Sequence, residues 1–369
     1  MSRRTDRLAT AQILGVKGRI INYTNRMRDI RDSFDVGMFS SFSPESFLTR
    51  DDGATVMTAD EISYWIVGQR IVALSCQETF ETLQNALGTL HIYDRTRIMQ
   101  IIVDAPEDYR NLFFEFADRI NVRNMSASGV FRTPRGTIDF NVSEDRNGPK
   151  GSYFVFFHEI GHMIDWALVN DRSHLFSNSF FTRQGSFSDT LFNALEKDVE
   201  SKLRSLANEL FGISNHPPEG VFSPQVAEEQ NTIKNKAISN IMAGNIVVAG
   251  PGLSSVEQFQ LLLQNETNSA LRGNSNSDRD EHNMVNPSNV FGGITNNAVR
   301  GNWSHTRDNY WFDNSGNPTY RQNSEFFANH FAAAMLNDEQ MLQNERDFFP
   351  EAMGVMDDII IHMTSQIGG

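Results

Sequence analysis

A segment in the middle of the chain places histidine and glutamate side chains within a strongly apolar stretch. Tyr153 to Phe157 is an unbroken apolar run that leads directly into His158, Glu159 and His162. The apolar residues that continue beyond this point are Met163, Ile164, Trp166 and Leu168. The pattern indicates a helix buried at the centre of a domain. Because ionisable groups are seldom buried without partners, the fold around this helix has to satisfy two imidazoles and one carboxylate.

The composition limits how those groups can be satisfied. The chain of 369 residues is 39% hydrophobic and 11% aromatic, which is typical of a folded globular protein with room for about two domains. Cys76 is its only cysteine, so an internal disulfide and the zinc sites built from several cysteines are excluded. Any metal would have to be held by histidine and carboxylate side chains.

Charge and hydropathy argue against two classes of partner. The formal net charge of −14 disfavours a sequence-independent grip on nucleic-acid phosphates. Lys17 and Arg19 interrupt the apolar stretch that follows Arg3, Arg4 and Arg7, which argues against a signal peptide. No run approaches the length of about 18 apolar residues that a membrane helix needs. We therefore expect a cytoplasmic protein that binds neither nucleic acid nor membrane.

Local signals predict that the first hundred residues are mainly helical. Thr58 to Glu61 forms a Thr-x-x-Glu capping box before an amphipathic run that ends near Gly88, a pattern typical of a helix start. A second helix is predicted to begin at Asp104, with Pro106 in its first turn.

The middle of the chain changes to a β pattern and then returns to helix. Short β-prone segments surround the turn residues Thr133 to Gly136, which predicts a hairpin between Val130 and Val142. Its second strand is expected to be Thr137 to Val142, where polar and apolar residues alternate. Ser152 is predicted to cap the apolar helix that follows.

The second half of the chain carries further helix signals and one polar stretch. Residues 187 to 212 show helical periodicity, and helices are also predicted from Ser324 to Leu336 and after Pro350. Between them, residues 264 to 300 are rich in Asn, Ser, Gly and charge. This composition predicts a long loop, serving as a lid or an insertion and lying outside the core.

His158-Glu159-Ile160-Gly161-His162 is an H-E-x-x-H motif. On a helix, its histidines lie one turn apart on the same face, so both imidazoles can bind one metal ion. Glu159 is rotated away from direct ligation and can accept a proton from a water that zinc has polarised. The other interpretation is a buried helix whose histidines form hydrogen bonds with neighbouring groups.

A catalytic zinc site needs a third protein ligand. Metzincins supply a third histidine six residues after the second, but Leu168 occupies that position and Asp165 replaces the preceding glycine. A carboxylate from a separate helix is the remaining option, and Glu325 is the best candidate. Glu325 can equally be read as a first-turn glutamate favoured by the helix dipole.

Two separated segments resemble one family, the gluzincin peptidases related to the catalytic domain of anthrax lethal factor. His158 to Asp165 resembles the family's H-E-[FI]-G-H-x-[VI]-D helix, and Glu325 to Phe331 is similar to its E-F-F-A-x-x-F helix. The resemblance covers about Val130 to Met363, with a long unmatched insertion. It implies that Glu325 is the third zinc ligand and that Asp165 orients a ligand imidazole.

The family also places a tyrosine before the glutamate helix, where its hydroxyl can stabilise an oxyanion. Two residues could take this role. Tyr320 lies closer to Glu325 than the family spacing implies, and Tyr310 lies farther upstream.

A second likeness concerns the origin of the chain. The stretch from Phe291 through His305 and Trp311 to Glu325 resembles lethal-factor-type domains of bacteriophage and mobile-element head proteins, although Ser304 replaces the usual glycine. This likeness implies a phage or prophage gene and association with the virion.

These observations predict an α+β, mainly helical zincin-like peptidase domain at residues 101–369, with an insertion at about 170–300. It follows a helical region, residues 1–100, of unknown role. The expected activity is zinc-dependent hydrolysis of a peptide or protein substrate, with Glu159 as general base. Two alternatives are a virion structural protein that keeps this fold to bind phage structural proteins, and an injected toxin-like effector.

Overall fold

The structure is a computed structural model that describes residues 59–125, 129–133, 136–148, 152–170, 179–214, 224–273, 282–307 and 309–367. The chain divides into two compact units, Met1–Gln77 and Glu78–Gly369. The limit between them lies upstream of residue 100, the limit expected from the sequence. In the first unit, the described residues form helix α3, Ala59–Leu74. The predicted capping box begins at Thr58 and so lies partly outside the described residues.

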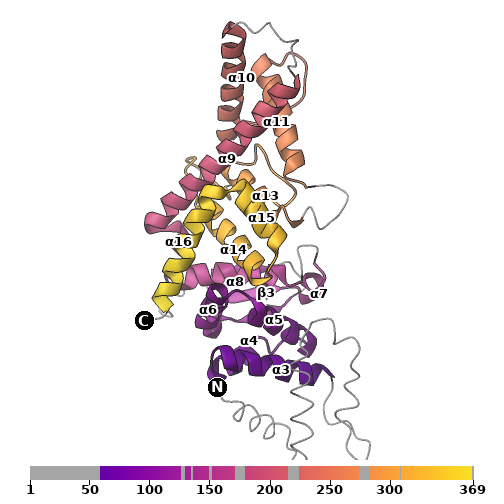
Figure 1. Ribbon diagram of the computed structural model, residues 1–369, viewed down its shortest axis with the longest axis vertical. Coiled ribbons are helices and arrows are strands. Elements are labelled where there is room, and N and C mark those ends of the chain that lie inside the picture. The colour runs from indigo at the N-terminus through magenta and orange to yellow at the C-terminus, as the bar shows by residue number, and fades with distance from the viewer. Residues whose placement is uncertain are drawn as a thin grey trace, which may run out of the picture. The chain divides into compact units, whose positions relative to one another are not determined.

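The rest of the described chain is mainly helical with one small sheet, as the α+β prediction required (Figure 1). Its helices of more than four residues are α4 (Gln77–Ala86), α5 (Ile92–Asp104), α6 (Glu107–Glu115), α8 (Phe154–Ala167), α9 (Gly185–Ser214), α10 (Pro224–Met242), α11 (Ser255–Ala270), α13 (Val285–Ile294), α14 (Arg321–Met335), α15 (Glu339–Phe348) and α16 (Pro350–Ile367). Short helices are η3 (Ala117–Arg119), α7 (Val142–Asp145) and η5 (Phe181–Arg183).

Several helix predictions are confirmed. The periodic segment from 187 to 212 lies within α9, the segment from Ser324 to Leu336 matches α14, and α16 begins at Pro350. The predicted helix start at Asp104 is wrong, because Asp104 ends α5 and α6 begins after its N-cap, Pro106. Helix α15 was not predicted from the sequence.

The sheet contains the predicted hairpin. Strands β2 (Val130–Arg132) and β3 (Thr137–Phe140) are antiparallel, and β1 (Val122–Asn124) pairs in parallel with the other side of β3. The second strand is shorter than expected, because Asn141 caps α7 by accepting hydrogen bonds from the backbone amides of Ser143 and Glu144. Strand β2 is left at an edge of the sheet.

The start of α8 differs from the prediction that Ser152 caps it. The N-cap is Tyr153, which has φ 64° and makes no side-chain capping bond. The carboxylate of Asp145, in α7, accepts hydrogen bonds from the amides of Val155 and Phe156 at 3.0 and 2.9 Å. A carboxylate from the preceding helix therefore satisfies the first amides of α8 and compensates its dipole.

The predicted loop from 264 to 300 is wrong in its described part. Helix α11 extends to Ala270, and every residue of α13 is buried. The Asn286 side chain donates to Oε1 of Glu345 at 2.6 Å, so this amide is satisfied within the core. A Cβ on Gly293 would lie 2.8 Å from Gln322 Cγ, so glycine allows α13 to pack tightly against α14. The composition that resembled a loop instead permits close packing.

Helices α8 and α14 make the most extensive helix–helix contact in the described chain. Every residue of α14 from Gln322 to Met335 is buried, as expected of a central helix. A Cβ on Gly161 would lie 2.8 Å from the Ala328 Cα atom. Glycine inside the H-E-x-x-H motif therefore lets the two backbones approach closely, which positions the functional site.

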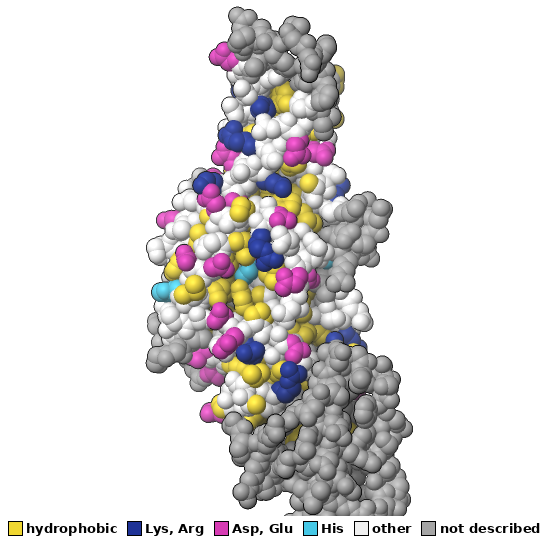
Figure 2. Space-filling model, viewed as in Figure 1, with side chains coloured by type: hydrophobic (Ala, Val, Ile, Leu, Met, Phe, Trp, Pro, Cys, Tyr) yellow, Lys and Arg dark blue, Asp and Glu magenta, His cyan; other side chains and the backbone are white. Residues whose placement is uncertain are grey.

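On the face drawn in Figure 2, the acidic and basic side chains of the described residues are interspersed. Among the described residues, no helix combines the length and the apolar character that crossing a bilayer requires.

Candidate metal centre

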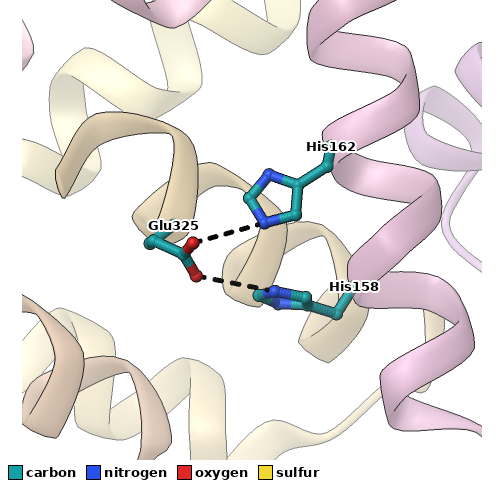
Figure 3. Close-up of side chains that lie close together, drawn as sticks. All are labelled: His158, His162 and Glu325. Atoms are coloured by element: carbon teal, nitrogen blue, oxygen red, sulfur yellow. Dashed lines mark ion pairs between the residues drawn. The ribbon is translucent and has the colours of Figure 1, made fainter. Parts of the chain in front are cut away.

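Three side chains from α8 and α14 converge on one point. The His158 Nε2 atom lies 3.5 Å from Glu325 Oε2, and His162 Nε2 lies 3.6 Å from Glu325 Oε1. One ligand atom from each residue lies within 4.8 Å of the other two. Figure 3 shows both imidazoles of α8 pointing toward the carboxylate of α14. The helical spacing of the histidines and the close approach at Gly161 together produce this arrangement.

The separations fit metal ligands better than hydrogen bonds. A hydrogen bond between N–H and O normally spans about 2.7–3.2 Å, which is shorter than the observed 3.5 and 3.6 Å. Ligands bound tetrahedrally at about 2.0–2.2 Å from zinc lie about 3.3–3.6 Å apart. Among the described residues, Glu325 Oε2 is buried and accepts no hydrogen bond. The donor set therefore fits a divalent ion such as zinc.

The charges of the site are coupled. Burial raises the pKa of the Glu325 carboxyl, but attraction to His162 and His305 outweighs burial and holds that pKa well below its usual value. Burial lowers the pKa of His162, whereas the charge of Glu325 raises it, and the net shift is upward. The site thus keeps Glu325 ionised, as a metal ligand must be.

Glu159 contacts strand β2. Its Oε2 atom accepts a hydrogen bond of 2.6 Å from the backbone amide of Phe131 in β2. Phe131 pairs with Ile138, whose own amide donates to Asn121 on the β1 side of β3. Phe131 and Ile138 are therefore a pair without mutual hydrogen bonds. In such a pair of an antiparallel ladder, both amides point away from the partner strand, so the Phe131 amide points to the side of β2 that faces away from β3. The buried Glu159 carboxylate is therefore held at this edge.

The structure distinguishes the two candidate tyrosines. The Tyr310 hydroxyl donates to Oε1 of Glu325, and burial followed by the charge of Glu325 raises the pKa of Tyr310. The Tyr320 hydroxyl instead donates to Asp189 of α9 at 2.7 Å, and its ring packs against Phe192. Of the two tyrosines, only Tyr310 contacts one of the three converging side chains.

His305 joins the site without having been identified as a ligand or catalytic candidate from the sequence. Its Nε2 atom lies 3.5 Å from Glu325 Oε2. Its ring stacks on Tyr310, with centroids 4.3 Å apart, and its carbonyl accepts a bond from the indole of Trp311. The sequence signal that could have identified His305 was its place close to the aromatic residues Tyr310 and Trp311. This pattern alone does not indicate that His305 has a chemical role.

Asp165 does not bond to a ligand imidazole as the resemblance implied. Its side chain is fully buried, and its oxygens accept hydrogen bonds from the amide and hydroxyl of Thr182 at 2.8 and 2.7 Å. It therefore anchors η5. In turn, η5 places Phe180 against the His162 ring and Arg183 on the Ser324 hydroxyl.

We expect Asp165→Ala to lower the free energy of unfolding by about 2–4 kcal/mol, because the buried Thr182 amide and hydroxyl both lose a charged acceptor. Urea denaturation monitored by circular dichroism measures this change. Asp358→Ala, which removes an exposed carboxylate of α16, is the control. Loss of metal binding with unchanged stability would contradict the anchoring role.

Comparison with protein-family models, curated proteins and solved structures gives no match to this chain.

Proposed function

We propose that the chain is a zinc-dependent endopeptidase of the gluzincin type, with a zincin-like fold around α8 and α14. The observation that carries the proposal is the convergence of His158, His162 and Glu325 at separations that fit a tetrahedral ion. Two imidazoles and one carboxylate are a ligand set found in catalytic zinc sites, where the fourth position stays open. When bound there, zinc would lower the pKa of water and polarise the scissile carbonyl.

The residues around the ligands supply the remaining chemistry. Glu159 would accept the proton of the attacking water and deliver it to the leaving amine. The Phe131 amide orients this carboxylate through one oxygen, Oε2. Tyr310 has a hydroxyl directed at the ligand Glu325, from which it can turn to donate to the oxyanion.

The edge of the sheet offers a way to hold the substrate. Strand β2 has a strand neighbour on one side among the described residues, and the Phe131 amide on its other side already contacts Glu159. An extended peptide that pairs with this edge would lie beside the general base. The position of Glu159 thus links substrate binding to proton transfer.

The proposal is tested by the metal content of the purified protein, measured by elemental mass spectrometry. We expect about one zinc per chain in the wild type and close to none in His162→Ala, since a site with two ligands binds far more weakly. The control is His91→Ala, which removes an exposed imidazole at the start of α5. Absence of zinc from the wild type, even after zinc addition and chelator-free purification, would favour a structural protein that keeps the fold without the chemistry.

The two tyrosines provide a matched test of the oxyanion donor. We expect Tyr310→Phe to reduce kcat for peptide hydrolysis by about 10²-fold, because an oxyanion donor acts mainly in the transition state. Tyr320→Phe should leave kcat close to the wild-type value, since its hydroxyl contacts Asp189. Steady-state kinetics on zinc-loaded variants measures both, and equal effects would refute the assignment to Tyr310.

A further inference from the structure

A guanidinium group lies beside the candidate metal centre. Arg183 donates from Nε and Nη2 to the Ser324 hydroxyl at 3.0 and 2.5 Å. Ser324 directly precedes Glu325 in α14. The Arg183 guanidinium also stacks over the Phe180 ring, with Cζ 4.0 Å from its centroid. These contacts fix the orientation of Arg183 next to the ligand carboxylate.

Arg183 has no carboxylate partner among the described residues. The nearby carboxylate of Asp165 has both oxygens bound by Thr182, and Glu325 faces imidazoles and the Tyr310 hydroxyl. Burial lowers the pKa of Arg183, whereas the charges of Asp165 and Glu325, which do not bond to it directly, raise that pKa. A half-buried cation bonded to a single neutral oxygen is unfavourable unless another group compensates its charge.

A second cation strengthens this excess of positive charge. Arg321 lies with its Cζ atom 4.6 Å from the centroid of the Tyr310 ring, which in turn contacts Glu325. The positive charge of Arg321 lowers the pKa of Arg183 further. Within the described chain, Arg321 also makes no ion pair with a carboxylate. The two guanidinium groups therefore lie near each other around Tyr310 and Glu325 without a direct counter-ion.

We infer that this site selects peptides that carry a carboxylate next to the scissile bond, bound by Arg183 with Arg321 adding to the local positive charge. The inference rests on the proposed function, of which it names the substrate class. A guanidinium binds a carboxylate through paired N–H groups, and the Nη1 group of Arg183 makes no hydrogen bond within the described residues. The carboxylate belongs either to an Asp or Glu side chain or to the C-terminus of the substrate, and in the second case the enzyme would act as a carboxypeptidase rather than as an endopeptidase.

The test uses three short hydroxamate peptides that share one framework and anchor to zinc through the hydroxamate. One ends in Gln amide and is neutral, one ends in Glu amide, and one ends in Gln with a free carboxylate. Isothermal titration calorimetry on the zinc-loaded full-length protein measures their affinities without requiring catalysis. We expect one charged peptide to bind at least about tenfold more tightly than the neutral one, and which of the two does so identifies the source of the carboxylate.

Substitutions of the two arginines test whether they cause the preference for a charged peptide. Arg183→Gln should remove the preference, measured as the ratio of charged to neutral peptide affinity in the same variant, and Arg183→Lys should keep part of it. Arg321→Gln should reduce the preference, which supports the inference even if Arg183→Gln fails to fold. Arg346→Gln, at an exposed position of α15, removes the same charge elsewhere and should change nothing.

The outcomes separate the inference from the proposed function. Equal binding of all three peptides to the zinc-loaded wild type would overturn the carboxylate preference and leave the metal site intact. A preference that persists in both Arg183→Gln and Arg321→Gln would also overturn it. Failure of the wild type to bind zinc or any hydroxamate would overturn the proposed function, and the inference with it.

Discussion

Glu159→Gln should reduce kcat for peptide hydrolysis by about 10²- to 10⁴-fold, because the amide cannot accept a proton from water. The bound zinc should remain at about one per chain, since Glu159 is not among the converging ligand atoms. The substitution keeps the size of the side chain, and its amide oxygen can still accept the bond that the Phe131 amide donates to Glu159. Folding should therefore be preserved.

The measurement combines steady-state kinetics on a cleaved peptide with elemental analysis of the same sample. Glu196→Gln is a matched control, because Glu196 is an exposed residue of α9. Retention of full activity in Glu159→Gln would refute its role as general base. Loss of zinc in the same variant would instead show that Glu159 supports the ligands.

Gly161→Val should lower the free energy of unfolding by about 1–3 kcal/mol and also abolish zinc binding. Even the first added carbon would lie 2.8 Å from the Ala328 Cα atom, and a backbone cannot move aside as a flexible side chain can. Separating α8 from α14 would carry Glu325 away from both histidines, so the ligand spacing would be lost.

Gly354→Val in α16 is the matched control, because a Cβ at that position meets no atom within 4 Å. It should leave stability and zinc content close to those of the wild type, or raise stability slightly, since glycine is a poor helix former. Thermal denaturation and elemental analysis measure both properties. Normal zinc binding in Gly161→Val would show that the close helix contact does not set the ligand geometry.

The sequence predicted elements whose signals are local. The helix after Tyr153, the helix from Ser324 and the hairpin around residue 134 each follow from periodicity or turn residues within a short window. The structure confirms these elements as α8, α14 and the β2–β3 pair. The positions of their ends were predicted less well, because they depend on groups outside the element. One such group is the Asp145 carboxylate, which bonds to the first amides of α8.

Polar residues led to wrong predictions where contacts with distant parts of the chain satisfy their hydrogen bonds. Asn, Ser and Gly between 264 and 300 resembled a loop, yet Asn286 bonds to the buried Glu345 and Gly293 packs against Gln322. Asp165 was expected to bond an imidazole, but its oxygens bind Thr182. In each case the partner lies outside the local sequence window.

The sequence by itself determined that His158 and His162 share one helix face, because a spacing of four residues is one helical turn whatever surrounds the helix. Only the tertiary structure decided that Glu325 completes their group, that Tyr310 rather than Tyr320 contacts it, and that His305 and Arg183 lie beside it. The pairing of Glu325 with the two histidines depends on how closely α8 and α14 approach at Gly161 and Ala328. That approach is set by packing between segments far apart in the chain, which no local pattern encodes.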